Sequence, residues 1–176
     1  MAEQPVFNVL FLCTGNSARS IIAEAILRKD GKGRFNAYSA GSRPRGAVHP
    51  LTVAVLTNMN YPMAGLRSKS WDEFTVPGSP RFDFVFTVCD SAAGEVCPAW
   101  PGSPVTAHWG IDDPAAVEGG DFEKATAFGE AFRFLKNRIA GFVSLPLSSL
   151  DVMSLKNQLT QLNQLEGTST SRKEIA

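Results

Sequence analysis

The sequence predicts an α/β domain built on a parallel sheet. Apolar segments of strand length alternate along the chain with segments of helical periodicity, and this order is typical of parallel strands joined by helical crossovers. The first apolar segment is nearly unbroken, as expected of a central strand that is buried on both faces. We expect strands over residues 6–12, 35–39, 82–88 and 105–108.

Helices fill the intervals between these strands. Gly31 and Gly33 should end the first helix, because glycine is common just past a helix C-terminus. The longest helix begins at Asp121 and carries an apolar stripe on one face, formed by Phe128, Phe132, Leu135 and Ile139. We expect helices over residues 18–29, 50–58 and 121–142, with a short helix near 71–74.

The length of 176 residues is most simply that of one domain with a full core. We expect residues 1–146 to form the α/β domain, residues 147–166 a C-terminal amphipathic helix packed on it, and residues 167–176 a disordered tail. The helix prediction rests on Leu155, Leu159, Leu162 and Leu165. These leucines could instead form a dimer seam, although the repeat is too short for a coiled coil.

Charge and cysteine content narrow the function classes. The 17 basic and 17 acidic residues cancel, so no basic field favours a nucleic acid or an anionic membrane as partner. The N-terminus lacks a basic region, and its apolar run is too short for a membrane span, so we expect a cytoplasmic protein. Three cysteines, an odd number, fit poorly with a framework of structural disulfides.

The stretch from Val9 to Ser20, Val-Leu-Phe-Leu-Cys-Thr-Gly-Asn-Ser-Ala-Arg-Ser, holds the strongest functional signal. An apolar strand runs into Cys13, five small or polar residues follow, and Arg19 then opens a helix. The N–H groups of such a tight loop converge on an anion, and the helix N-terminus adds about half a positive charge. No Gly-Lys-Ser/Thr follows Gly15, which excludes a nucleotide-binding P-loop. The stretch therefore predicts a cup for a tetrahedral oxyanion, with a nucleophilic sulfur at its base.

Residues of this loop have distinct expected roles. Arg19 adds a planar fork that matches two oxygens of phosphate or arsenate. The positive field should hold the pKa of Cys13 below the free value of about 8.5, and Ser20 can donate a hydrogen bond to the sulfur. The alternative is a buried structural cysteine, but its position between strand and helix favours function. The expected oxyanion-binding residues are Thr14, Gly15, Asn16, Ser17, Ala18 and Arg19.

Asp112-Asp113-Pro114 supplies the predicted general acid. A thiolate that attacks an oxyanion must expel a poor leaving group, which needs a proton donor. Asp113, directly before the proline, is favoured over Asp112 for this role. The alternative is an ordinary turn, in which aspartate is common.

Cys89 and Cys97 predict redox chemistry. Cys89 directly follows a strand, so in a parallel sheet it should lie at the same carboxyl-end rim as Cys13 and the loop 110–114. The small residues between the two cysteines could fold back and bring them within the roughly 7 Å that a disulfide needs. They lack C-x-x-C spacing and a second ligand pair, so zinc is not expected. The alternative is a pair of buried thiols.

These residues resemble the low-molecular-weight protein tyrosine phosphatase fold and, within it, the arsenate reductases that use three cysteines and thioredoxin-type reductants. The resemblance covers roughly residues 6–142 and includes Ala23-Glu24, Ser39-Ala-Gly41 and Asp113-Pro114. It implies three layers, with a four-stranded parallel sheet flanked by helices. It further implies a nucleophile, an oxyanion clamp, an acid and two more redox cysteines, which would be Cys13, Arg19, Asp113, Cys89 and Cys97 respectively.

The predicted activity is arsenate reduction to arsenite, in arsenic detoxification, through a Cys13 adduct and a relay of disulfides. Two departures from the phosphatases favour it. Ala18 stands where those enzymes usually carry a second loop cysteine, and Ala115-Ala116 where they tend to carry tyrosines. The alternatives are a tyrosine or aryl phosphatase, whose activity a reductase could also show weakly, and a non-enzymatic oxyanion-binding regulator.

The resemblance also implies the partners. We expect no bound cofactor and an external thiol reductant: thioredoxin is favoured, with glutaredoxin and glutathione, or mycothiol, as alternatives. Phosphate should bind as an analogue of arsenate. Some relatives bind potassium beside the loop, where Asn16, Glu24 and Ser39 match, and no other metal is expected. Seven residues separate Cys89 and Cys97, which is not the spacing of every relative.

Overall fold

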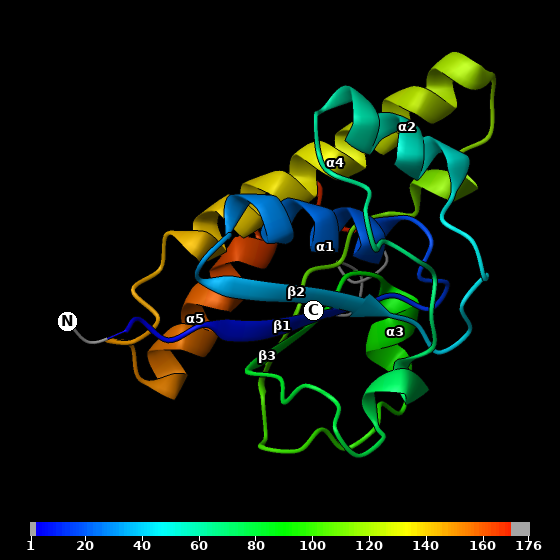
Figure 1. Cartoon of the computed structure of the whole chain (residues 1–176). Coiled ribbons are helices and arrows are strands. Elements are labelled where there is room, and N and C mark those ends of the chain that lie inside the picture. The colour runs from blue at the N-terminus through cyan, green and yellow to red at the C-terminus, as the bar shows by residue number, and fades with distance from the viewer. Residues whose placement is uncertain (1–2, 170–176) are drawn as a thin grey trace.

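The predicted strands form one parallel sheet. The computed structural model describes residues 3–169, and its strands are β1 (Phe7–Leu12), β2 (Phe35–Ala40), β3 (Phe84–Thr87) and β4 (Val105–His108). They pair in parallel in the order β2-β1-β3-β4 (Figure 1). The predicted fold class is confirmed. Because β1 is central, the chain leaves it for the functional loop in the middle of the sheet's carboxyl-end rim.

Helices occupy the predicted intervals, and two short ones were not expected. The α-helices are α1 (Arg19–Asp30), α2 (Pro50–Asn58), α3 (Asp90–Gly94), α4 (Asp121–Val143) and α5 (Val152–Asn163), and the 3-10 helices are η1 (Trp71–Phe74) and η2 (Pro114–Ala116). The short α3 and η2 begin at side chains that accept backbone N–H groups, the sulfur of Cys89 and the carboxylate of Asp113. Single turns of this kind are set by a cap and show no apolar periodicity.

The main core lies between one face of the sheet and α1, α4 and α5 (Figure 1). Phe142 of α4 packs against aromatic rings of three strand residues, Phe35, Phe84 and Phe86. The helix α1 is buried all round from residue 20 to residue 27, because it lies between the sheet and α4.

The opposite face of the sheet carries a smaller cluster formed by Leu10, Leu12, Ala40, Phe82 and Val85. Its cover comes mostly from η1 and from loops, with the partly buried rings of Tyr38, Trp71, Phe74 and Trp100. Cys97 packs against the same cluster. The third predicted cysteine therefore lies on a face that loops cover, and loops rearrange more readily than packed helices.

The C-terminal part of the chain packs on the domain through α5. Leu155 and Leu159 are buried in the main core, and the indole nitrogen of Trp109 donates a hydrogen bond to the carbonyl of Leu159 at 3.0 Å. Residues 167–169, expected to be disordered, are held instead: Thr168 forms an antiparallel bridge with Ile111. Residues 170–176 of the predicted tail lie outside the described residues.

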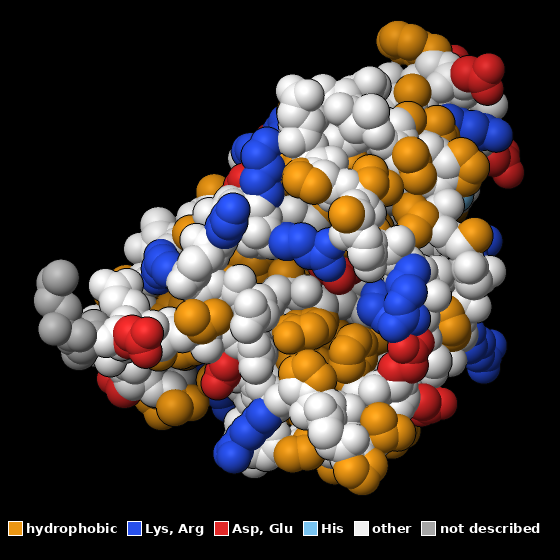
Figure 2. Space-filling model, in the orientation of Figure 1, with side chains coloured by type: hydrophobic (Ala, Val, Ile, Leu, Met, Phe, Trp, Pro, Cys, Tyr) orange, Lys and Arg blue, Asp and Glu red, His pale blue; other side chains and the backbone are white. Residues whose placement is uncertain are grey.

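The surface shows no dominant charge. Figure 2 shows Lys and Arg side chains interspersed with Asp and Glu over the visible face, as expected from a formal net charge of zero. Within residues 3–169, no helix is long and apolar enough to cross a membrane.

Candidate active site

The loop from Cys13 to Ala18 links β1 to α1, and hydrogen bonds among buried side chains fix its conformation. Asn16 has a φ of 42°, a left-handed conformation that asparagine tolerates better than most residues. Its amide nitrogen donates to the hydroxyls of Ser20 at 2.8 Å and Ser39 at 3.0 Å. Its amide oxygen accepts the backbone N–H of Lys69 at 2.8 Å. No side chain caps α1 at Ala18, so the helix N-terminus is left open to an anion.

The end of β2 approaches this loop very closely. A Cβ atom on Gly41 would overlap the backbone carbonyls of Cys13 and Thr14, so only glycine fits there. The backbone N–H of Arg43 donates to the Thr14 carbonyl, and that of Arg45 to the Gly15 carbonyl, each at 3.0 Å. The loop is thereby fixed along its outer side.

A cavity of about 410 Å³ opens over the loop. Its lining combines the expected oxyanion-binding residues with two thiols, a carboxylate and basic side chains, namely residues 13–19, Arg43, Arg45, Cys89, Ser91, Asp113 and Ala115. Cys13, Cys89 and Asp113 come from three separate segments. As expected for a parallel sheet, they meet at one rim.

Arg19 is fixed at the edge of the cavity. One guanidinium nitrogen, Nη1, donates to the carbonyl of Ile111 at 2.7 Å, and Nη2 lies 3.7 Å from Oδ2 of Asp113. The guanidinium is thus oriented by the loop that carries the predicted acid. A guanidinium held in this way can present its remaining donors to two oxygens of a bound oxyanion.

The structure distinguishes the two neighbouring aspartates. Asp113 lines the cavity, and its Oδ1 accepts the backbone N–H of Ala115 at 3.0 Å. Asp112 is exposed and lines a different depression, next to α4. The geometry therefore favours Asp113 as the acid.

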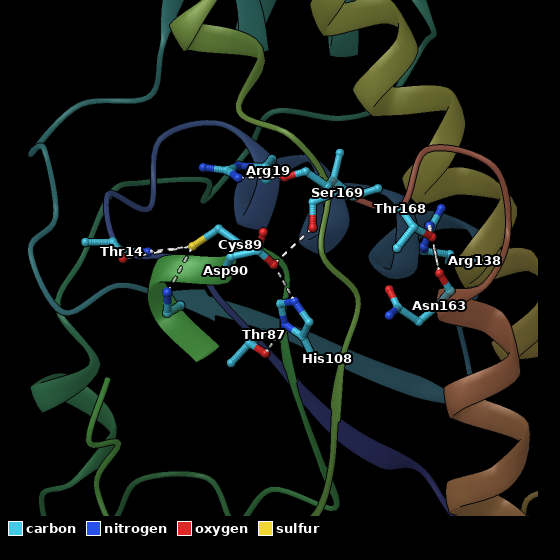
Figure 3. A network of polar contacts seen from close by, with 12 residues as sticks. Thr14, Arg19, Thr87, Cys89, Asp90, His108, Arg138, Asn163, Thr168 and Ser169 are labelled. Carbon is cyan, nitrogen blue, oxygen red and sulfur yellow. Dashed lines mark hydrogen bonds and ion pairs between the residues drawn. The ribbon is translucent and has the colours of Figure 1, made fainter. Parts of the chain in front are cut away.

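Cys89 lies in an environment that stabilises a thiolate. Its sulfur accepts the backbone N–H groups of Thr14 and Ala92, both at 3.4 Å (Figure 3). A hydrogen bond from the Cys13 thiol and the positive charge of Arg19 act in the same direction, and together they lower the pKa of Cys89 to about 6.

The pKa of Cys13 differs from the sequence-based expectation. The hydrogen bond to Cys89 and burial raise it well above the ordinary value, although Arg19 opposes the shift. The physical reason is that two thiols in contact share one negative charge, and the second ionisation then meets a like charge. The pair therefore shares one negative charge, and the contacts of Cys89 favour the thiolate there.

We expect the thiolate absorbance of the reduced protein to show a titration step near pH 6. Above this pH the pair carries one thiolate, and below it both thiols are protonated. Cys13→Ala removes the hydrogen-bond donor that is the largest cause of the low pKa of Cys89 and should move the step to higher pH. Cys97→Ser, the matched control, should leave the step in place, because Cys97 lies outside the cavity. Absence of any thiolate below about pH 8 in the wild type would contradict the prediction.

Cys97 is not brought together with the other two cysteines. It is partly buried against the second face of the sheet, and burial raises the pKa of its thiol. Glu95, two residues earlier, accepts a hydrogen bond from the Thr14 hydroxyl at 2.7 Å. This bond ties the segment between the two cysteines to the functional loop, and α3 separates Cys89 from Cys97. All three thiols are free in this structure.

The residues matched to a potassium site do gather beneath the loop. The Ser39 hydroxyl donates to Glu24 at 2.7 Å and accepts from Asn16, while Arg28 pairs with the other oxygen of Glu24 at 2.8 Å. The Lys69 ammonium lies 3.5 Å from the Ser39 hydroxyl. Burial raises the pKa of Glu24 and lowers that of Lys69. Because these groups already have protein partners and a neighbouring cation, the mechanism that we propose for this site uses no metal ion.

Sequence reasoning missed several residues of the site. Arg43 and Arg45 line the cavity and follow β2 at the same rim, in a run of basic residues that could have drawn attention. The Ile111 carbonyl and the Glu95 carboxylate carry no sequence signal. The predicted donation from Ser20 to the Cys13 sulfur stays a prediction; in this structure the Ser20 hydroxyl accepts a hydrogen bond from Asn16.

Comparison with known proteins agrees with this geometry. The model of the family described as low molecular weight phosphotyrosine protein phosphatase matches residues 8–151. The arsenate reductase of Halalkalibacterium halodurans is 37% identical over 134 residues, which are 76% of this chain and 93% of that protein.

Two solved structures are also similar. The thioredoxin-dependent arsenate reductase of Corynebacterium glutamicum has a TM-score of 0.54 and 28% identity, and the match covers 79% of this chain and 64% of that one. An arsenate reductase in the phosphate binding state has a TM-score of 0.64 and 23% identity, and the match covers 79% of this chain and 98% of that one. This likeness shows the fold. Because the family model spans most of the sequence, this chain belongs to the low molecular weight phosphotyrosine protein phosphatase family.

Proposed function

We propose that the protein is an arsenate reductase that acts in arsenic detoxification. The observation that carries the proposal is the position of Cys89: a second thiol, with its pKa lowered to about 6, lies in the same oxyanion cavity as Cys13. Hydrolysis of a phosphate ester needs one nucleophilic sulfur, whereas reduction of arsenate needs two electrons from a pair of thiols. The curated and solved relatives named arsenate reductases support the same activity.

The first step forms a sulfur–arsenic bond. The loop N–H groups and Arg19 hold arsenate over Cys13, whose thiol proton passes to the neighbouring Cys89 thiolate as the sulfur approaches the anion. Cys13 attacks arsenic, an As–O bond breaks, and Asp113 protonates the departing oxygen so that it leaves as water. Arsenic remains As(V) in this adduct.

The second step transfers the electrons. Cys89 gives the proton that it accepted in the first step to solvent, and its thiolate attacks the sulfur of Cys13. The S–As bond breaks, and its electron pair stays on arsenic. Arsenite, As(III), is released, and the two thiols are oxidised by two electrons to a Cys13–Cys89 disulfide. Phosphorus has no comparably accessible lower oxidation state, so a phosphate adduct can only be hydrolysed.

The third step regenerates the nucleophile. Cys97 attacks Cys89, frees Cys13 as a thiolate and leaves a Cys89–Cys97 disulfide on the loop-covered face of the sheet. For this step α3 must unwind, because it separates the two cysteines. Thioredoxin is the proposed reductant of that disulfide, supported by the thioredoxin-dependent relative, and a reducing cytoplasm is the proposed compartment.

Aryl phosphatase activity remains the second candidate, because Cys13, Arg19 and Asp113 suffice for it. Phosphate and arsenate have the same shape and charge, so the loop binds both. Ala115, at the wall of the cavity, offers no aromatic surface for an aryl ring. We therefore propose this activity as a weak side reaction.

The proposal is tested by trapping the first disulfide. Cys97→Ser lacks the thiol that resolves it, so one equivalent of arsenate should convert this variant to a stable Cys13–Cys89 disulfide and release one equivalent of arsenite. Peptide mass spectrometry identifies the linked peptides. Phosphate in place of arsenate, the matched control, should leave all thiols reduced. If arsenite forms without this disulfide, the relay is wrong.

A further inference from the structure

The C-terminal residues after α5 return to the rim of the active site. We call residues 164–169 the C-terminal strap. It begins beyond residue 151, where the match to the family model ends, and Figure 3 shows its last residue, Ser169, next to Asp90 at the start of α3. Its Thr168 and Ser169 lie next to the loop that carries the acid.

Arg138 of α4 holds the strap. Its side chain is fully buried, and its guanidinium donates to three strap groups: the carbonyls of Glu166 and Leu165 at 3.0 and 3.1 Å and the hydroxyl of Thr168 at 3.0 Å. Burial of the guanidinium lowers the pKa of Arg138 to about 10, so it stays protonated at neutral pH. A buried charge with several hydrogen bonds is costly to disrupt, and the strap is therefore firmly anchored.

The anchored strap is bonded in turn to the loop 110–113. Thr168 bridges Ile111, and the backbone N–H of Ser169 donates to the Gly110 carbonyl at 3.0 Å. The Ser169 hydroxyl donates to Asp90 at 3.0 Å, and the same carboxylate oxygen lies 2.8 Å from Nε2 of His108 (Figure 3). Only 2% of Ser169 is exposed.

Gly110 is enclosed by these groups. A Cβ atom there would lie 2.5 Å from the Ser169 hydroxyl, 2.6 Å from His108 Nε2 and 2.7 Å from Asp90 Oδ1. Side chains of the strap, of the start of α3 and of the end of β4 thus fix the position of Gly110, the first residue of the loop that carries Asp113. The next residue, Ile111, provides the carbonyl that orients Arg19, and Asp113 follows two positions later.

From these contacts we infer that the strap is a positioning element for catalysis, with Ser169 as its principal residue. It fixes the loop whose carbonyl aims Arg19 and whose carboxylate faces the oxyanion. The inference rests on the proposed role of Asp113 as the acid. Small displacements of such groups have large effects, up to about a hundredfold for 1 Å.

The test replaces the backbone donor of the strap. Ser169→Pro removes the N–H that binds Gly110 and should lower the kcat of arsenate turnover about tenfold, less than the full effect of a 1 Å displacement. The KM should change less than kcat. Hydrogen exchange in residues 109–116 should be faster. Glu166→Gln is the matched control, since its side chain pairs with Arg133 in solvent and touches no loop residue.

Thr168→Val provides a second variant if the proline variant does not fold. It removes the hydroxyl that binds Arg138 and should show the same changes with smaller amplitude. Wild-type kcat in a variant with faster loop exchange would overturn the inference, and so would unchanged exchange. A wrong proposed function can be told apart from a wrong role of the strap. In the first case the wild type lacks arsenate turnover, but hydrogen exchange still shows whether the strap fixes the loop 110–113.

Discussion

Cys89→Ser and Cys97→Ser are each expected to lower arsenate turnover by at least about a thousandfold. Cleavage of p-nitrophenyl phosphate by both variants should stay within about threefold of wild type. Cys89→Ser removes the sulfur that attacks Cys13 and thereby releases the S–As electron pair to arsenic. Cys97→Ser leaves the first disulfide unresolved after one turnover. Cleavage of the phosphate ester persists because Cys13, Arg19 and Asp113 remain.

The two variants also report on the shared charge. In Cys89→Ser the Cys13 thiol loses the hydrogen bond that is the largest cause of its raised pKa, so its pKa falls. Phosphate-ester cleavage by this variant should therefore extend to lower pH than in wild type, since the thiolate is the attacking form. Cys97→Ser, whose changed side chain lies outside the cavity, should keep the wild-type pH profile. Arsenate turnover that survives both substitutions would exclude the three-cysteine relay.

Asp113→Asn should lower the kcat for both arsenate and p-nitrophenyl phosphate by about 10² to 10⁴, the usual contribution of a positioned general acid. Asparagine keeps the size of the side chain and its bond to the Ala115 N–H, but it cannot deliver a proton to the leaving oxygen. Steady-state kinetics with the two substrates measure the effect.

Asp112→Asn is the matched control for this change. The substitution is the same and its position is adjacent, but Asp112 is exposed and lines a different depression, so its kcat should stay within about twofold. Equal losses in the two variants would mean that both carboxylates share the acid role. A normal kcat in Asp113→Asn would remove this residue from the mechanism.

The sequence was most informative where local physics decides the outcome. The unbroken apolar run before Cys13 predicted the central strand, because only a strand buried on both faces has that pattern. The order of strand, cysteine, small loop and arginine predicted the anion-binding cup, because loop N–H groups and a helix start produce it locally. Placing Cys89 and Asp113 at the same rim needed one more rule, that parallel strands end at one edge.

Sequence reasoning was less informative where side chains from distant segments meet. The helix α3 forms because the Cys89 sulfur accepts an N–H at its start, and the five-residue turn has no periodic pattern. The bond between Thr14 and Glu95 joins positions 81 residues apart. The tail from residue 167 onward was expected to be disordered, but Arg138 binds the Thr168 hydroxyl and the Ser169 N–H donates to Gly110, and no local pattern reveals these contacts.

By itself, the sequence determined the fold class, the oxyanion loop and the set of three cysteines, since each follows from the order of residues along a short stretch. The tertiary structure alone brought the two thiols together and lowered the pKa of Cys89. Two sulfurs in contact cannot both be ionised, and backbone N–H groups from two segments stabilise the charge on Cys89. It also decided that Cys97 begins apart from them and that the C-terminal strap reaches the acid-bearing loop, because distance through space is not encoded in any local pattern.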